Sequence, residues 1–182
     1  MGWIELHPHD PTWVEEYETE QKNIRSLADD GLLDTFHVGS TAIPRLPAKP
    51  IIDILAIYST QSTVHDAKDA LLSEYRVLRE TESFEDGETR VVLLNEERTP
   101  SITLHLRPQD AQGWRDQLVF RELLRNDRVA RAMYEGAKRT AVEAYPNDGE
   151  SYTAAKKPVI ELLTERAYAE GYDEILPGSE VT

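Results

Sequence analysis

The sequence contains no cysteine, which excludes disulfide frameworks and thiolate metal sites. No apolar run approaches the roughly 20 residues that a membrane-spanning helix needs. The N-terminal segment MGWIELHPHD reaches a proline and two histidines before the apolar region of a secretory signal could develop. These absences predict a cytoplasmic protein that does not associate with membranes.

Positive charge is also scarce. The chain has 20 Lys and Arg residues against 34 Asp and Glu residues, which gives a formal net charge of −14. Binding to nucleic acid requires a broad basic surface, so a nucleic-acid partner is unlikely on this composition, and any anion site must be a local positive pocket. An acidic surface with few lysines is also typical of proteins from a high-salt cytoplasm, so a halophilic source is one open interpretation.

The length of 182 residues predicts one folded domain. Apolar spacing and turn residues predict helices at about 11–29, 62–73, 110–125 and 127–145, a last helix from Ser151 that Pro158 kinks or restarts, and strands at 33–38, 51–58, 75–79, 89–94 and 101–106. The strand at 51–58 is apolar without alternation, which is typical of a central strand covered on both faces. We expect a mixed α/β core over 1–108, a C-terminal helical lobe over 109–170 and a loose tail over 171–182.

The most informative segment is HVGSTAIPRLPAKPIIDI, which runs from His37 to Ile54. In it a strand leads into Gly39, Ser40 and Thr41, and a proline-containing loop then leads into a second strand. Glycine lets backbone amides approach a phosphate closely, and the two hydroxyls add donors to the same anion. We therefore expect Gly39, Ser40 and Thr41 to bind phosphate.

The second strand of this segment carries a single acidic residue, Asp53, among isoleucines and leucine. An ionised carboxylate in such surroundings costs several kcal/mol unless it is paired, so Asp53 needs a partner. The candidate partners are Lys49, Arg90, His105 and Arg107. Asp53 either acts in a functional site or anchors one of these residues, and His105 either shares that site or is a half-buried histidine that cross-links strands.

Several motifs together resemble the GrpB family, which also occurs as a domain attached to some dephospho-CoA kinases. The resemblance extends from Trp13 to about Ala167 and implies the fold of the nucleotidyltransferase superfamily. We therefore expect an α+β fold, with a small mixed sheet, helices on one side and a C-terminal helical lobe. The motifs are the segment from His37 to Ile54, LHL around His105, FRELLR from Phe120, and the Tyr-x-x-x-Lys pairs Tyr134/Lys138 and Tyr152/Lys156.

The pattern departs from an active nucleotidyltransferase. Such enzymes carry Asp-x-Asp or Asp-x-Glu on one strand, so that both carboxylates point at one pair of metal ions. In this chain the same-face neighbour of Asp53 is Leu55, and a later strand offers His105 where a third carboxylate is expected; Glu88 is a further candidate acid. Asp53 with His105 suits a softer divalent ion better than Mg²⁺, so we expect Mg²⁺ or Mn²⁺ to bind only weakly.

Four basic residues are expected to form one cationic pocket for the phosphates: Lys49, Arg121, Lys138 and Lys156. Lys138 and Lys156 each follow a tyrosine by four positions, which places ring and ammonium on one side of a helix. The alternative is ordinary packing with a snorkelling lysine.

The predicted ligand is a phosphate-bearing small molecule, specifically a nucleotide. Two functions stay open on the sequence alone. One is a nucleotidyl- or phosphoryl-transferring enzyme in which Asp53 and His105 are catalytic. The other is a binding module that keeps the anion pocket but has lost the metal carboxylates.

Overall fold

The computed structural model describes residues 3–82, 89–111 and 113–176. The predicted helices and strands are present, with shifts of a few residues at their ends. In chain order they are α1 (Thr12–Ala28), β1 (Leu32–Val38), the short 3-10 helix η1 (Ser40–Ala42), β2 (Ile51–Tyr58), α2 (Gln61–Leu71), β3 (Arg76–Glu82), β4 (Thr89–Asn95), β5 (Ser101–Pro108), α3 (Gly113–Asn126), α4 (Arg128–Ala144), α5 (Gly149–Ala169) and η2 (Tyr172–Ile175). Within the described ranges, none of the helices combines the length and the apolar character needed to cross a membrane.

Contacts divide the chain into two compact units. The sheet unit comprises Asp10–Ala42 and Pro50–Trp114. The helical unit comprises Met1–His9, Ile43–Lys49 and Arg115–Thr182. The chain therefore leaves the sheet unit directly after η1, contributes one short segment to the helical unit, and returns to begin β2.

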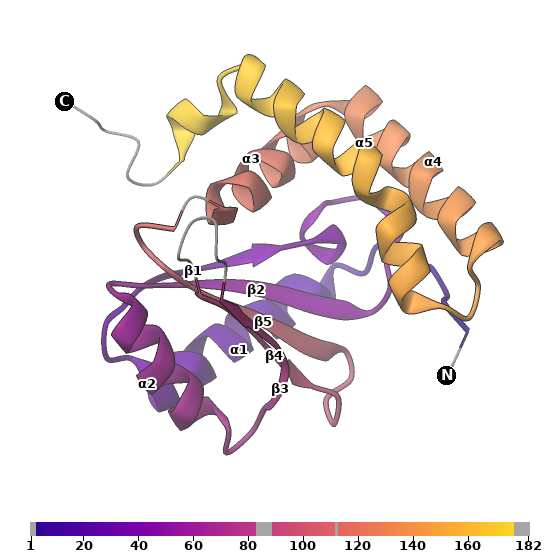
Figure 1. Cartoon of the computed structure of the whole chain (residues 1–182). Helices are drawn as coiled ribbons and strands as arrows, with labels where there is room; N and C mark the ends of the chain where they lie inside the picture. The colour runs from indigo at the N-terminus through magenta and orange to yellow at the C-terminus, as the bar shows by residue number, and fades with distance from the viewer. Residues whose placement is uncertain (1–2, 83–88, 112, 177–182) are drawn as a thin grey trace. The chain divides into compact units, whose positions relative to one another are not determined.

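A five-stranded mixed sheet with the order β1-β2-β5-β4-β3 forms the sheet unit (Figure 1). β2 and β5 pair in parallel, and the other neighbours pair antiparallel. Helices α1 and α2 lie on the same face of this sheet (Figure 1). The predicted α+β fold with a small mixed sheet and helices on one side is confirmed, and the apolar strand β2 is an interior strand.

A buried carboxylate on α1 links this helix to the residue before β3 and to the turn between β4 and β5. Glu20 is 0% exposed, accepts a hydrogen bond from the hydroxyl of Tyr75, and pairs with Arg98 at 2.6 Å. Burial and this hydrogen bond raise the pKa of the Tyr75 phenol. Sequence analysis missed this cluster. Its signal is that Glu20 falls between Trp13 and Ile24 at helical spacing, where an apolar residue is expected.

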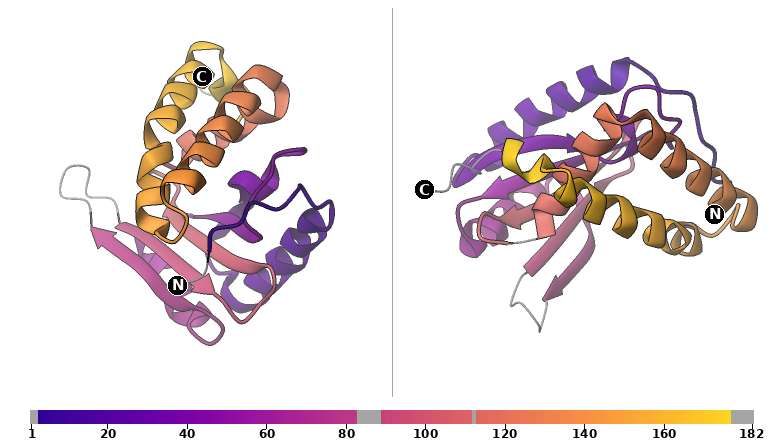
Figure 2. Two further views of the ribbon diagram at one scale, coloured as in Figure 1. Left: turned by 90° about the vertical axis from the view of Figure 1, so that its right-hand side faces the viewer. Right: turned by 90° about the horizontal axis from the view of Figure 1, so that it is seen from above.

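In the helical unit, α4 and α5 lie side by side (Figure 2). Asp127 caps α4 and also pairs with Arg166 of α5. The expected restart at Pro158 does not occur, because a single helix spans Gly149–Ala169. Pro158 and Ala154 are exposed, so solvent can satisfy the carbonyl that loses its partner to the proline.

Candidate functional site

The turn after β1 packs directly against the carboxylate of β2. Gly39 has a φ of 70° and follows Val38, which pairs with Asp53 across the two strands. A Cβ atom at position 39 would lie only 2.4 Å from Oδ2 of Asp53. Both the left-handed backbone and this close approach require glycine. The structure therefore brings the predicted phosphate turn and the lone aspartate together.

Asp53 finds its partner on the neighbouring parallel strand. Nε2 of His105 lies 3.3 Å from Oδ1 of Asp53, and both side chains are half-buried. The hydroxyl of Tyr58 on β2 bonds the carbonyl of Ala28 in α1, so alternation along β2 places Asp53, and with it His105, on the sheet face that points away from this helix. Two of the predicted site residues that are 52 positions apart in sequence are thus neighbours.

The hydroxyl of Thr41 already has two partners. It donates a hydrogen bond to the carbonyl of Ile51 and lies 2.9 Å from Nε2 of His37. Because the only hydroxyl proton goes to Ile51, Nε2 of His37 must carry the proton of the second hydrogen bond. His37 is buried and stacks on the ring of Tyr17. Thr41 therefore ties the turn to the first residue of β2 by a hydrogen bond. Gly39, in contrast, is exposed, and Ser40 is half-buried.

Position 55 offers no oxygen ligand to a metal ion, because it carries a buried leucine. Leu55 is 0% exposed and lies opposite His105 in the β2–β5 register. No group of three or more His, Asp or Glu side chains that could hold a metal ion occurs within the described residues. The candidate acid Glu88 lies outside them. Asp53 and His105 alone do not fit a two-metal centre.

Three of the predicted cationic residues gather around two tyrosine rings in the helical unit. The Nζ atoms of Lys156 and Lys49 lie 4.0 and 5.2 Å from the centre of the Tyr152 ring. The Nζ atom of Lys138 lies 5.6 Å from the centre of the Tyr134 ring. Burial raises the pKa of Tyr152, so its phenol stays neutral beside the two ammonium groups. We call these three lysines and two tyrosines the lysine–tyrosine cluster.

Lys138 is the most enclosed member of this cluster. It is 1% exposed, and its ammonium donates a hydrogen bond to the carbonyl of Pro47. Pro47 belongs to the short segment between the Gly39 turn and Asp53. Lys138 therefore fixes the loop that joins the two predicted functional strands.

Arg121, the fourth predicted cation, bonds an acidic neighbour on its own helix. Its guanidinium on α3 bonds the carboxylate of Glu122 at 2.7 Å, and Arg125 bonds the same carboxylate at 3.2 Å. The charge of Glu122 is therefore shared between two arginines. The role of Arg121 in phosphate binding stays a prediction.

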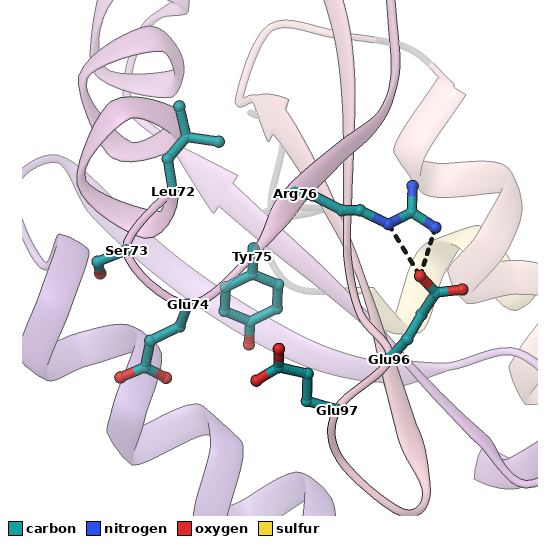
Figure 3. A pocket seen from close by; sticks show the side chains of 7 residues that line it. All are labelled: Leu72, Ser73, Glu74, Tyr75, Arg76, Glu96 and Glu97. Atoms are coloured by element: carbon teal, nitrogen blue, oxygen red, sulfur yellow. Dashed lines mark hydrogen bonds and ion pairs between the residues drawn. The ribbon is translucent and has the colours of Figure 1, made fainter.

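A separate hollow of about 320 Å³ lies at the start of β3 (Figure 3). Its lining includes Glu74, Glu96 and Glu97, and Arg76 points at Glu96 with two hydrogen bonds of 2.6 and 2.9 Å. Three carboxylates and one neutralised arginine disfavour an anionic ligand here. This hollow is therefore not the expected phosphate site.

Comparison with known proteins gives a consistent result. Residues 3–166 match the family model described as GrpB protein. A UPF0157 protein of Streptomyces coelicolor is 36% identical over 91% of this chain and 85% of its own length. A dephospho-CoA kinase of Mycolicibacterium paratuberculosis is 25% identical over 91% of this chain, which matches only 46% of that protein.

Solved structures agree with this match. The crystal structure of GrpB from Enterococcus faecalis has a TM-score of 0.72 and 22% identity, and covers 90% of this chain and 99% of its own. A structure of the Cid1 poly(U) polymerase has a TM-score of 0.54 at 8% identity, over 81% of this chain and 50% of the polymerase. At such low identity the second likeness shows the nucleotidyltransferase-like fold alone.

Proposed function

The chain belongs to the GrpB family, and from this premise we propose that it binds a phosphate-bearing small molecule, specifically a nucleotide, at the turn formed by Gly39 and Ser40. The exposed backbone of this turn supplies donors for phosphate oxygens, and Ser40 adds a hydroxyl. Asp53 and His105 lie beside it and orient the remainder of the ligand.

The observation that carries this proposal is the contact between Gly39 and Asp53. A Cβ atom at position 39 would clash with the Asp53 side chain, so the turn can approach the carboxylate this closely only because residue 39 is glycine. Glycines that let the backbone approach another group closely are one of the devices by which proteins build ligand sites.

The lysine–tyrosine cluster supports the same class of ligand. Three of the six lysines in a chain with a net charge of −14 converge there, and they supply the local positive charge that an anion requires. We propose Lys49 and Lys156 as phosphate-binding residues of the helical unit, and Lys138, which is enclosed and bonds the carbonyl of Pro47, as a source of positive charge beside them. Only Pro50 separates Lys49 from Ile51, the first residue of β2.

The proposal does not include nucleotidyl transfer by two metal ions. Asp53 would hold a single Mg²⁺ or Mn²⁺ weakly, and only when phosphate oxygens of the ligand complete the coordination. Such an ion would screen the charge of the phosphates; the chain's own residues would bind and orient the ligand. Binding without efficient transfer is therefore the function that the geometry favours.

Substitution of Lys156 tests the cationic part of this proposal. In a calorimetric titration with ATP, we expect Lys156→Gln to weaken binding about ten-fold and to reduce its salt dependence, because one ammonium no longer faces the phosphates. Lys157→Gln is the matched control, since Lys157 is exposed and pairs with Glu161 at 3.6 Å. Equal affinities in native chain and Lys156→Gln would remove the cluster from the site.

A further inference from the structure

A short strap before α1, from Ile4 to His7, is bonded to the rest of the helical unit at two places. The amide of Ile4 donates to the carbonyl of Pro146 at 2.8 Å, just beyond the end of α4 (Figure 1). His7 forms an isolated antiparallel bridge with Ala48. Its amide donates to the Ala48 carbonyl at 2.8 Å, and its carbonyl accepts from the Ala48 amide at 2.9 Å. The strap therefore pairs with the residue directly before Lys49 of the lysine–tyrosine cluster.

The residues on either side of Ala48 are held by other elements of the helical unit. The carbonyl of Pro47 accepts a hydrogen bond from Lys138 on α4, and Ala48 itself is 0% exposed. The ammonium of Lys49 lies over the ring of Tyr152 on α5. Three successive residues are thus held by α4, by the strap and by α5, in that order, and all of these contacts lie within the helical unit.

The turn that leads into these residues is strained. The amide of Leu46 donates to the carbonyl of Ile43 at 3.3 Å, which closes a turn around Arg45. Arg45 has a φ of 70°, a conformation that residues with a Cβ atom rarely adopt and that turns usually assign to glycine. Strained residues persist where the surrounding contacts over-determine them. The conformation of the segment that ends at Lys49 therefore depends on contacts from other parts of the chain, and the strap makes two of them.

We propose that the strap is a positioning element of the proposed phosphate site, which holds Lys49 at the lysine–tyrosine cluster by pairing with Ala48. This inference rests on the proposed function. The strap acts on binding through Lys49 and makes no contact with the ligand. Without the pairing, the strained turn relaxes and the ammonium is no longer held over the Tyr152 ring. A charge that is held in place before binding favours the anion more than the same charge on a loose segment, because binding then orders less of the chain.

Substitution of His7 by proline tests this inference, because proline lacks the amide that donates to Ala48. In a calorimetric titration with ATP, we expect His7→Pro to weaken binding about three- to ten-fold and to reduce its salt dependence, as Lys49→Gln does. His7→Ala is the matched control, since it keeps the amide and removes only a side chain that is 50% exposed. This control is expected to bind ATP as the native chain does. Thermal unfolding checks that all variants are folded.

A double-mutant cycle separates positioning from a general loosening of the fold. In the Lys49→Gln background no ammonium is left to position, so we expect His7→Pro to weaken ATP binding there by less than about two-fold. An undiminished loss in that background would overturn the inference, as would native affinity in His7→Pro alone. If His7→Pro does not fold, Ile4→Pro takes its place in the cycle, because it releases the other end of the strap from Pro146.

The inference and the proposed function fail in different ways. If Gly39→Ala weakens ATP binding and His7→Pro does not, the inference is wrong and the proposed function stands. If the native chain does not bind ATP, or Gly39→Ala leaves binding unchanged, the proposed function is contradicted and the role of the strap is overturned with it. Hydrogen exchange of the native chain adds a measurement without ligand. We expect the Ala48 amide to be protected, and exchange as fast as in an unstructured chain would also overturn the inference.

Discussion

Replacing Leu55 by aspartate is expected to lower the free energy of unfolding by about 3–5 kcal/mol, the cost of a buried charge that lacks a partner. Leu55 is 0% exposed, and its same-face neighbour on β2 is Asp53. The new carboxylate would therefore be both desolvated and close to a like charge. Chemical denaturation of the variant and the native chain measures this difference.

The same variant tests the interpretation of the missing metal ligand. If an aspartate at position 55 completes a metal site with Asp53, Mn²⁺ will raise the unfolding midpoint of Leu55→Asp and not that of the uncharged control Leu55→Asn. We expect this selective rescue. A Leu55→Asp variant as stable as the native chain without metal would show that position 55 is not part of a closed core.

Gly39→Ala is expected to lower the free energy of unfolding by about 2–5 kcal/mol and to abolish tight phosphate binding. The left-handed backbone adds about 1–2 kcal/mol for a residue with a Cβ atom, and overpacking adds about 1–3 kcal/mol. The new methyl group would also push Asp53 away from His105. Denaturation and pyrophosphate titration measure the two effects separately.

Gly136→Ala on α4 is the matched control, because a Cβ atom there meets no heavy atom within 4 Å. It is expected to stabilise the chain by about 0.5–1 kcal/mol, as alanine usually does within a helix. In the double variant Gly39→Ala/Asp53→Ala, part of the clash disappears, so a coupling of about 0.5–3 kcal/mol is expected. Strictly additive effects would contradict the close contact between the two residues.

Local pattern predicted the elements and the Gly39–Asp53–His105 group well. Strand β2 could be predicted because its apolar run has no alternation, and the Gly39 turn could be predicted because this glycine precedes two residues with hydroxyl groups. His105 could be predicted only as one of four candidate partners of Asp53, because the sequence does not determine which strand lies beside β2. The parallel β2–β5 register decided it.

Other features depended on tertiary contacts that no local pattern encodes. The motif predicts that Thr41 donates a hydrogen bond to phosphate, but in the structure its hydroxyl bonds Ile51 and His37. A bulge between Val77 and Arg79 shifts the alternation of β3, so that Arg76 and Arg79 lie on the same face of the sheet. A prediction that assumes regular alternation along β3 therefore assigns Arg79 to the wrong face.

The most direct test of the central claim is a titration of the native chain with ATP and Mg²⁺, with pyrophosphate release followed in the same solution. We predict saturable binding that Gly39→Ala and Lys156→Gln weaken, and pyrophosphate release no faster than that of Asp53→Ala. Robust release that Asp53→Ala abolishes would contradict binding without two-metal transfer. The absence of any saturable binding would contradict the phosphate site itself.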